Sequence, residues 1–264
     1  MKKHFLAIAL LFFFSACGAG QRMESPEKSA VQNEIMVGRA LAAKLIKKYG
    51  LIKNESATVY LNLLGQSLAA SSARPELLFH FGILNTDEVN AFSCPGGYIL
   101  ITRGALEHMT NEAELAYVLA HEISHVSLSH SGDFRSEKGI IDFIAVFIGA
   151  GGHVVNGAVR TATALLEKQI LENGRQKEFE FEADRAALLL TAPLGYDPGA
   201  ALTYLGRIAG AEKNEILVKT HPAFSERIAG LQIFITEQGL GENAKSKRKQ
   251  RFENFIKLLK GNGT

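Results

Sequence analysis

The spacing of hydrophobic residues predicts a chain that is mainly helical. Apolar positions recur at helical intervals over residues 31–48, and further helical patterns cover 57–68, 176–190, 198–209 and 222–238. The clearest helix is predicted over 111–130, where Asn111 can cap the first turn and Glu114 stands at the capping-box position. These patterns indicate one compact domain with an apolar core.

A smaller set of segments is typical of β-strands. Residues 77–84, 88–92 and 98–102 are short and apolar, and the turn Pro95-Gly96-Gly97 lies between the last two. The sequence therefore predicts an α+β fold, mainly α, with a small sheet or hairpin beside the helix over 111–130.

The N-terminus has the architecture of a secretory signal. Lys2 and Lys3 precede an unbroken apolar run over 5–14, which is too short to span a bilayer, and small residues lead to Cys17. The segment Phe14-Ser15-Ala16-Cys17-Gly18 resembles the bacterial lipobox, so we expect a signal peptide over 1–16 and a lipid on Cys17. The alternative is an ordinary cleaved signal with a chance cysteine. Gly18 is not the Asp that would indicate inner-membrane retention, which favours the outer membrane.

The remaining chain divides into a polar tether over 17–30, a main domain over 31–240 and a basic tail over 241–264. The tail carries a helical pattern, and we expect a solvated helix or contact with anionic lipid. Residues 139–150 are very apolar and are expected to form a buried helix or a lip at the membrane. Lysine and arginine total 29 against 27 acidic residues, which gives no reason to expect a nucleic-acid partner. With only two cysteines, Cys94 is expected to be a lone thiol that acts as a small apolar filler.

The residues that indicate chemistry are His121-Glu122-Ile123-Ser124-His125. Helical residues four apart lie on one face, so both imidazoles can bind a single metal ion. Glu122 projects beside that face and can act as a general base on water. This pattern predicts a catalytic zinc site with one ion per chain.

A third ligand is needed, because catalytic zinc has three protein ligands and an open position. His130 lies about half a turn away around the helix, so we interpret it as a surface residue or as one that supports a ligand. Glu180 and Asp184 are four apart and suit a ligating carboxylate together with one that orients a histidine. The alternative for this pair is an acidic, solvated helix face.

Four segments together resemble the zinc endopeptidase family that includes the CAAX prenyl proteases, bacterial HtpX and the BepA-type proteases. They are the run from Asn90 through Ala91 and Phe92 to Pro95-Gly96-Gly97, the helix at His121, Glu180 to Asp184, and His221-Pro222 with Arg227. The resemblance covers most of the chain and implies a gluzincin-like domain.

The resemblance also implies roles for particular residues. Glu180 would be the third ligand, and Asp184 would orient a histidine. His221 would lie near the zinc, either steadying the oxyanion or blocking the open position, and Arg227 would orient carboxylates or substrate. The alternative for these last two is helix capping and a surface ion pair. Relatives usually carry Arg three residues before the third ligand, where this chain has Lys177 with Arg175 nearby.

We therefore expect a zinc metalloendopeptidase of the bacterial cell envelope that acts on unfolded or misassembled envelope proteins. The strand at Asn90, Ala91 and Phe92 would pair with an extended substrate. Two alternatives remain: a chaperone-like assembly factor for outer-membrane proteins that retains the zinc site, and a binding lipoprotein with structural zinc.

Overall fold

The computed structural model describes residues 26–131, 155–211, 215–241 and 247–260. The predicted signal peptide, Cys17, most of the expected tether and the apolar segment over 139–150 lie outside the described residues. Within the described part, none of the helices is both long and apolar enough to cross a membrane.

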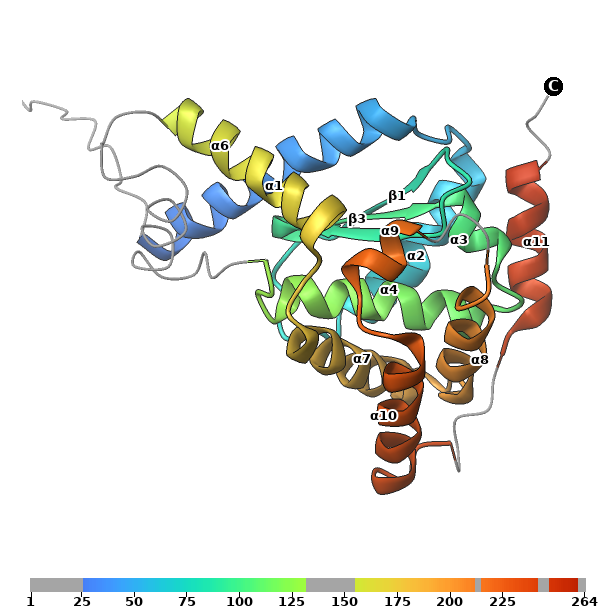
Figure 1. Cartoon of the computed structure of the whole chain (residues 1–264). Helices are drawn as coiled ribbons and strands as arrows, with labels where there is room; N and C mark the ends of the chain where they lie inside the picture. Colours follow the sequence, from blue (N-terminus) through green and yellow to red (C-terminus); the bar gives the residue numbers. More distant parts are fainter. Residues whose placement is uncertain (1–25, 132–154, 212–214, 242–246, 261–264) are drawn as a thin grey trace, which may run out of the picture.

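Helices dominate the fold, and three strands form one small sheet (Figure 1), which confirms the predicted α+β class. The α-helices are α1 (Pro26–Tyr49), α2 (Glu55–Ala69), α3 (Arg103–Glu107), α4 (Glu112–Ser127), α6 (Val155–Lys168), α7 (Lys177–Thr191), α8 (Gly199–Ile208), α9 (Glu215–Thr220), α10 (Phe224–Glu237) and α11 (Lys249–Lys260). The strands are β1 (His80–Leu84), β2 (Ala91–Cys94) and β3 (Tyr98–Thr102). Short 3₁₀ turns cover Pro95–Gly97 and Ala192–Leu194, and a π-turn covers Gln169–Asn173.

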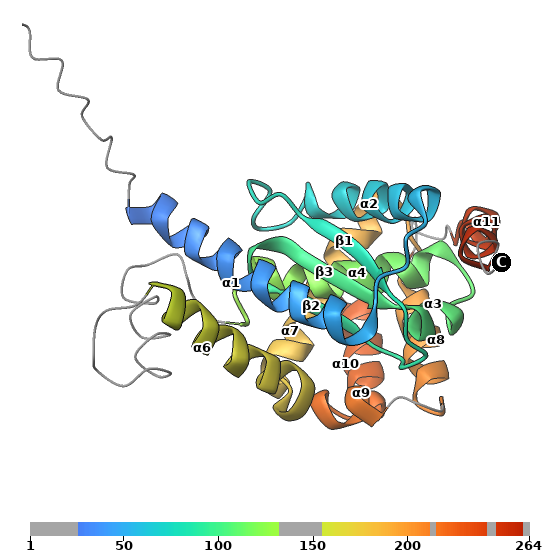
Figure 2. The same ribbon diagram turned by 90° about the horizontal axis from the view of Figure 1, so that it is seen from above.

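The sheet has the order β1-β3-β2, with β1 parallel and β2 antiparallel to β3. Side chains alternate between the two faces of a strand, so the sheet buries apolar groups on both sides. Ile99 and Ile101 belong to the larger core with α2 and α4, whereas Leu100 and Phe92 join the smaller core with α1 and α6. The view from above shows α1 and α6 side by side next to the sheet (Figure 2).

The turn between β2 and β3 depends on its two glycines. Gly96 and Gly97 have φ angles of 68° and 94°, a region that residues with a Cβ rarely adopt. The Gly96 N–H donates to Glu34 on α1 at 3.0 Å, which holds the turn against that helix. The hairpin predicted around Pro95 is therefore confirmed.

The central helix α4 begins as predicted. The Asn111 side chain accepts a hydrogen bond from the Glu114 N–H at 3.1 Å, and the Glu114 carboxylate accepts from the Thr110 N–H at 2.8 Å. Every residue of α4 is buried, because α2, α7 and α8 and the sheet surround it. Side chains on α4 are consequently held in a rigid, water-poor setting.

Both ends of the described chain differ from expectation. Helix α1 begins at Pro26, inside the expected tether, where proline suits the first helical turn. The tail forms α11, but the expectation of a solvated helix is wrong for one face. Phe252 and Phe255 are buried, and Phe255 stacks on Tyr60 of α2 with ring centroids 4.5 Å apart.

Candidate metal centre

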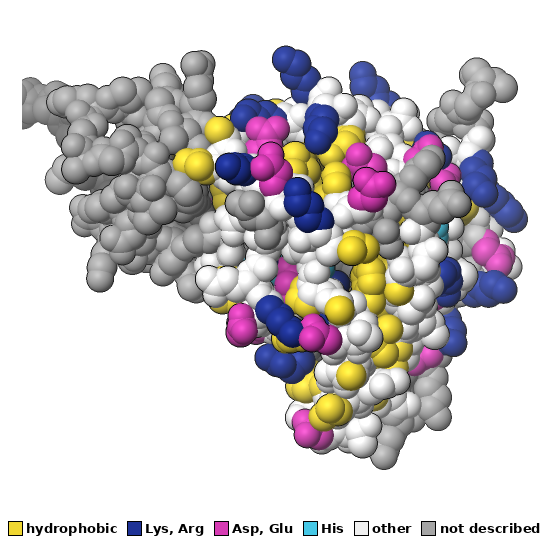
Figure 3. Space-filling view, viewed as in Figure 1, with side chains coloured by type: hydrophobic (Ala, Val, Ile, Leu, Met, Phe, Trp, Pro, Cys, Tyr) yellow, Lys and Arg dark blue, Asp and Glu magenta, His cyan; other side chains and the backbone are white. Residues whose placement is uncertain are grey.

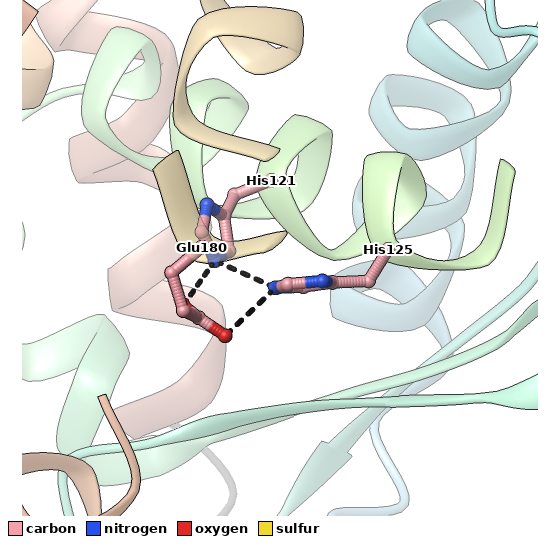
Figure 4. A group of neighbouring side chains, drawn as sticks. All are labelled: His121, His125 and Glu180. Atoms are coloured by element: carbon pink, nitrogen blue, oxygen red, sulfur yellow. Dashed lines mark hydrogen bonds and ion pairs between the residues drawn. The ribbon is translucent and has the colours of Figure 1, made fainter. Parts of the chain in front are cut away.

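Helix α4 carries the two histidines that the sequence singled out. Because they are one turn apart, His121 and His125 present their Nε2 atoms to the same point, and these atoms lie 3.0 Å apart. Both rings are buried, at 4% and 0% exposure. Figure 4 shows the two rings converging on one carboxylate.

That carboxylate belongs to Glu180, in the first turn of α7. One of its oxygens lies 3.4 Å from Nε2 of His121, and the other lies 3.3 Å from Nε2 of His125. Glu180 is fully buried, and neither oxygen has a hydrogen-bond partner among the described residues. An unsatisfied buried carboxylate is costly, so this arrangement fits a bound cation. Ligand atoms of the three residues lie within 4.8 Å of one another, and two imidazoles with one carboxylate suit zinc.

Burial alone would raise the pKa of Glu180. The neighbouring His221, His125 and His121 outweigh that effect and hold its pKa well below the usual range. Burial also lowers the pKa of His125 well below that of an exposed histidine. A carboxylate beside a neutral imidazole is the protonation state in which both groups can bind a metal ion.

The far side of His121 is held by a buried ionic network. Its Nδ1 lies 2.9 Å from Asp184, one turn along α7 from Glu180. Arg227 of α10 grips the same carboxylate with two hydrogen bonds of 2.6 and 2.8 Å, and Tyr117 donates to it at 2.7 Å. The structure thus places Asp184 and Arg227 beside the candidate metal centre rather than at the surface.

Glu122 stands next to the histidines with an unanticipated partner. The Ser93 hydroxyl, on β2, donates to the Glu122 carboxylate at 2.6 Å. Arg175 donates to both the hydroxyl and the carbonyl oxygen of Ser93, at 3.0 and 3.2 Å. Sequence reasoning missed Ser93, because no local spacing connects it with Glu122.

Two residues, Lys177 and Arg175, stand near the position where relatives usually carry an arginine, three residues before Glu180, and each makes a different contact. Lys177, at that position, makes an exposed ion pair with Glu226 on α10. Arg175, two residues before Lys177, contacts Ser93 on β2 instead. The positive charge near the site therefore comes from Arg175 and not from the position of Lys177.

Cys94 is fully buried, and burial raises the pKa of its thiol to about 12. This confirms the interpretation of Cys94 as a small apolar filler.

His221 enters the site from the end of α9. Its Nε2 lies 3.3 Å from a Glu180 oxygen, and its ring centroid is 6.3 Å from that of His121. Burial lowers the pKa of His221, which favours the neutral ring. Beside it, a pocket is lined by Glu122 and by apolar groups that include Leu205, Ile208 and Leu217. In the space-filling view a band of hydrophobic side chains covers the region of α9 and α10 (Figure 3).

The predicted substrate strand runs along the pocket, displaced slightly from expectation. Asn90 precedes β2, and its carbonyl accepts from the Thr102 N–H at 3.1 Å. By antiparallel alternation, the backbone groups of Ala91 and Ser93 point away from β3. The Ala91 N–H is taken by the Asn90 side chain at 2.9 Å, and Phe92 is buried against α1. β2 is therefore an edge strand, bounded on one side by the candidate metal centre.

His130 is not one of the three candidate ligands, as expected, but α4 ends at Ser127, before this residue, so helical phase does not place it. Of the two expected positions, the structure excludes the surface and agrees with a residue that supports a ligand. His130 is buried, and its Nδ1 lies 2.8 Å from Nδ1 of His125. Of the other histidines, His80 is exposed at the start of β1, and His108 bonds the Gly104 carbonyl. Neither belongs to the candidate metal centre.

Comparison with known proteins agrees with this geometry. Over 213 residues the chain is 29% identical to the "Beta-barrel assembly-enhancing protease" of Escherichia coli (strain K12), which covers 76% of this chain and 43% of that protein. It is 27% identical over 208 residues to the "Putative beta-barrel assembly-enhancing protease" of Vibrio cholerae, covering 75% and 43%. It is 32% identical over 162 residues to the "Mitochondrial metalloendopeptidase OMA1" of Arabidopsis thaliana, covering 60% and 32%. The chain spans less than half the length of these relatives.

Residues 55–234 match the family described as Peptidase family M48. The matched region includes α4 and α7 and most of α10, and these helices carry His121, Glu122, His125, Glu180 and Arg227. The chain therefore belongs to peptidase family M48.

Proposed function

We propose that this protein is a zinc-dependent endopeptidase of the bacterial cell envelope that cleaves unfolded or misassembled envelope proteins. The observation that carries the proposal is the buried Glu180 carboxylate, which lacks hydrogen-bond partners among the described residues and faces two imidazoles beside Glu122. A pocket lined by His121, Glu122 and His221 adjoins this carboxylate and offers space for a substrate beside the base.

In this proposal His121, His125 and Glu180 hold one zinc ion. The ion, when bound, supplies Lewis-acid chemistry: it polarises a peptide carbonyl and acidifies water. Glu122 accepts a proton from the attacking water and delivers it to the leaving amine. The Ser93 hydroxyl keeps the Glu122 carboxylate in one orientation, so that the proton acceptor is in place before substrate binds.

His221 and Arg227 have different tasks. His221 lines the same pocket as Glu122, and its ring can steady the oxyanion that develops on the peptide carbonyl. The same position would let it hinder an open coordination site in a resting state. Arg227 contacts Asp184 and acts through it, keeping the His121 ring oriented.

Substrate would bind as an added strand along β2. The outward-facing carbonyl of Ala91 and N–H of Ser93 can pair with an extended peptide, which favours unfolded chains over folded ones. The apolar wall formed by Leu205, Ile208 and Leu217 would accept a hydrophobic side chain next to the cleaved bond. Main-chain pairing with one apolar pocket predicts broad sequence tolerance.

The proposed location follows from the N-terminal sequence. A lipid on Cys17 would tether the domain to a membrane surface, and Gly18 favours the outer membrane. The relatives named for β-barrel assembly support an envelope role, and the substrates proposed here are misassembled envelope proteins.

The test compares the chain starting at Ser25 with its Glu122→Gln variant, using casein as an unfolded substrate and measuring zinc content of both. Glu178→Gln is a matched control, because Glu178 is an exposed carboxylate on α7. We expect cleavage by the parent and control, and loss of cleavage in Glu122→Gln with zinc retained.

Equal cleavage by parent and Glu122→Gln would refute the role of Glu122. Zinc binding without cleavage in any form would favour the chaperone-like assembly factor, unless His221→Ala restores cleavage and thereby identifies a blocked enzyme.

A further inference from the structure

The ring of His125 has two nitrogens, and each faces a different partner. Nε2 points to the candidate metal centre, 3.3 Å from Glu180. Nδ1 points the other way and lies 2.8 Å from Nδ1 of His130. His130 is 5% exposed, and its ring stacks on that of Phe179 with centroids 4.5 Å apart and planes 7° from parallel.

One arrangement of protons satisfies all these contacts. A nitrogen that binds a metal ion must offer its lone pair, so His125 carries its proton on Nδ1. That N–H then donates to Nδ1 of His130, which must also present a lone pair. The proton of His130 is therefore on Nε2, and this nitrogen lies 3.3 Å from the Glu182 carboxylate.

We propose that His130 is a positioning residue for His125. It fixes the tautomer and the ring orientation in which His125 binds metal, and Glu182 orients His130 in turn. The inference rests on the metal site of the proposed function. His130 does for His125 what Asp184 does for His121.

Helix α7 supplies the supporting groups on both sides. Asp184 contacts His121, while Phe179 and Glu182 contact His130. Glu180 lies between them on the same helix and faces both ligand rings. Residues three or four apart share a face of a helix. Phe179 and Glu182 therefore lie together toward His130, and Glu180 and Asp184 lie together toward His121.

The test is the zinc dissociation constant of the full-length chain in detergent, measured by competition with a chromogenic chelator. His130→Leu keeps apolar bulk against Phe179 but removes the acceptor, whereas His130→Asn places an oxygen acceptor near the position of Nδ1. His80→Leu is the control, because His80 is exposed on β1 and outside the site.

We expect His130→Leu to weaken zinc binding about 10- to 100-fold, the usual effect of losing a group that orients a ligand. His130→Asn should recover most of this loss, and His80→Leu should match the parent. The visible spectrum of the Co²⁺-substituted protein should change in His130→Leu and resemble the parent in His130→Asn, because it reports ligand geometry.

Zinc affinity of a folded His130→Leu within twofold of the parent would overturn the proposal. Equal weakening by Leu and Asn would also overturn it, because packing rather than the acceptor would then matter. A parent chain that binds no zinc would refute the metal site itself and this inference with it.

If His130→Leu does not fold, Glu182→Gln tests the same hydrogen bonds from the surface, where 51% of the Glu182 side chain is exposed. We expect a loss of zinc affinity of about two- to fivefold, because exposed charge interactions are weak. Glu178→Gln should have no effect. Identical affinities of these two variants would overturn the proposal.

Discussion

Replacing Arg227 with leucine removes the guanidinium that grips the Asp184 carboxylate, and both residues are buried, at 4% and 1% exposure. Breaking a buried ion pair costs about 3–5 kcal/mol, because one charge is left without its partner. Asp184 would still accept hydrogen bonds from Tyr117 and from His121. We therefore expect the free energy of unfolding to fall by about 3 kcal/mol, near the lower end of this range. This is a large share of the 5–15 kcal/mol typical of a folded domain.

The measurement is urea unfolding of the chain starting at Ser25, with a chelator present so that metal binding does not contribute. Since the chain contains no tryptophan, far-ultraviolet circular dichroism should follow the transition. Lys177→Ala is the matched control, because the Lys177–Glu226 pair joins the same two helices but is 49% and 48% exposed. Its cost should be at most about 1 kcal/mol.

Arg227→Lys separates charge from geometry. Lysine restores a positive charge but not the two-pronged contact with Asp184, so its stability should lie between those of the parent and Arg227→Leu. A loss below 1 kcal/mol for Arg227→Leu would refute the reasoning, because Asp184 would then not depend on this cation. Equal losses for Arg227→Leu and Lys177→Ala would do the same.

Three further results are expected. Ser93→Ala should lower kcat/KM for an unfolded substrate about tenfold without changing zinc content, because it removes a hydrogen bond to a charged group; an unchanged kcat/KM would show that Glu122 is held by other contacts. Burial lowers the pKa of His121, but the neighbouring Asp184 and Glu180 carboxylates outweigh it and raise the pKa to about 9 in the metal-free protein. Zinc must displace that proton, so its affinity should rise with pH up to about 9, and calorimetry in two buffers at pH 7 should detect proton release; pH-independent affinity would contradict this. Phe255→Ala should destabilise the domain by about 3–5 kcal/mol in urea unfolding, because its ring is buried against Tyr60; a loss below 1 kcal/mol would mean that α11 contributes little to the core.

The sequence by itself determined the features that depend on local geometry. Residues four apart on a helix share a face whatever surrounds them, so the spacing of His121 and His125 predicted converging rings. The same rule paired Glu180 with Asp184, and the start of α4 followed from the hydrogen-bonding capacity of Asn111 and Glu114. Short apolar segments on either side of the paired glycines predicted the hairpin at β2 and β3.

Only the tertiary structure decided which distant groups support those residues. Ser93 and Glu122 are 29 positions apart, and Arg175 and Ser93 are 82 apart, so their contacts exist only because β2, α4 and the segment before α7 lie together in the fold. His130 was excluded as a ligand by its helical phase, but its contact with His125 arises after α4 has ended. A helical pattern fixes directions within its own helix and carries no information beyond it.

The ends of the domain show the same division. The apolar spacing of α11 predicted a helix, but whether Phe252 and Phe255 face water or protein depended on the presence of α2 beside them. Residues near the start of α1 lack apolar periodicity, so the sequence placed a tether where the helix begins. Local sequence sets what each segment can form, and burial against its neighbours decides which faces are covered, because the free energy of burial comes from contacts between segments.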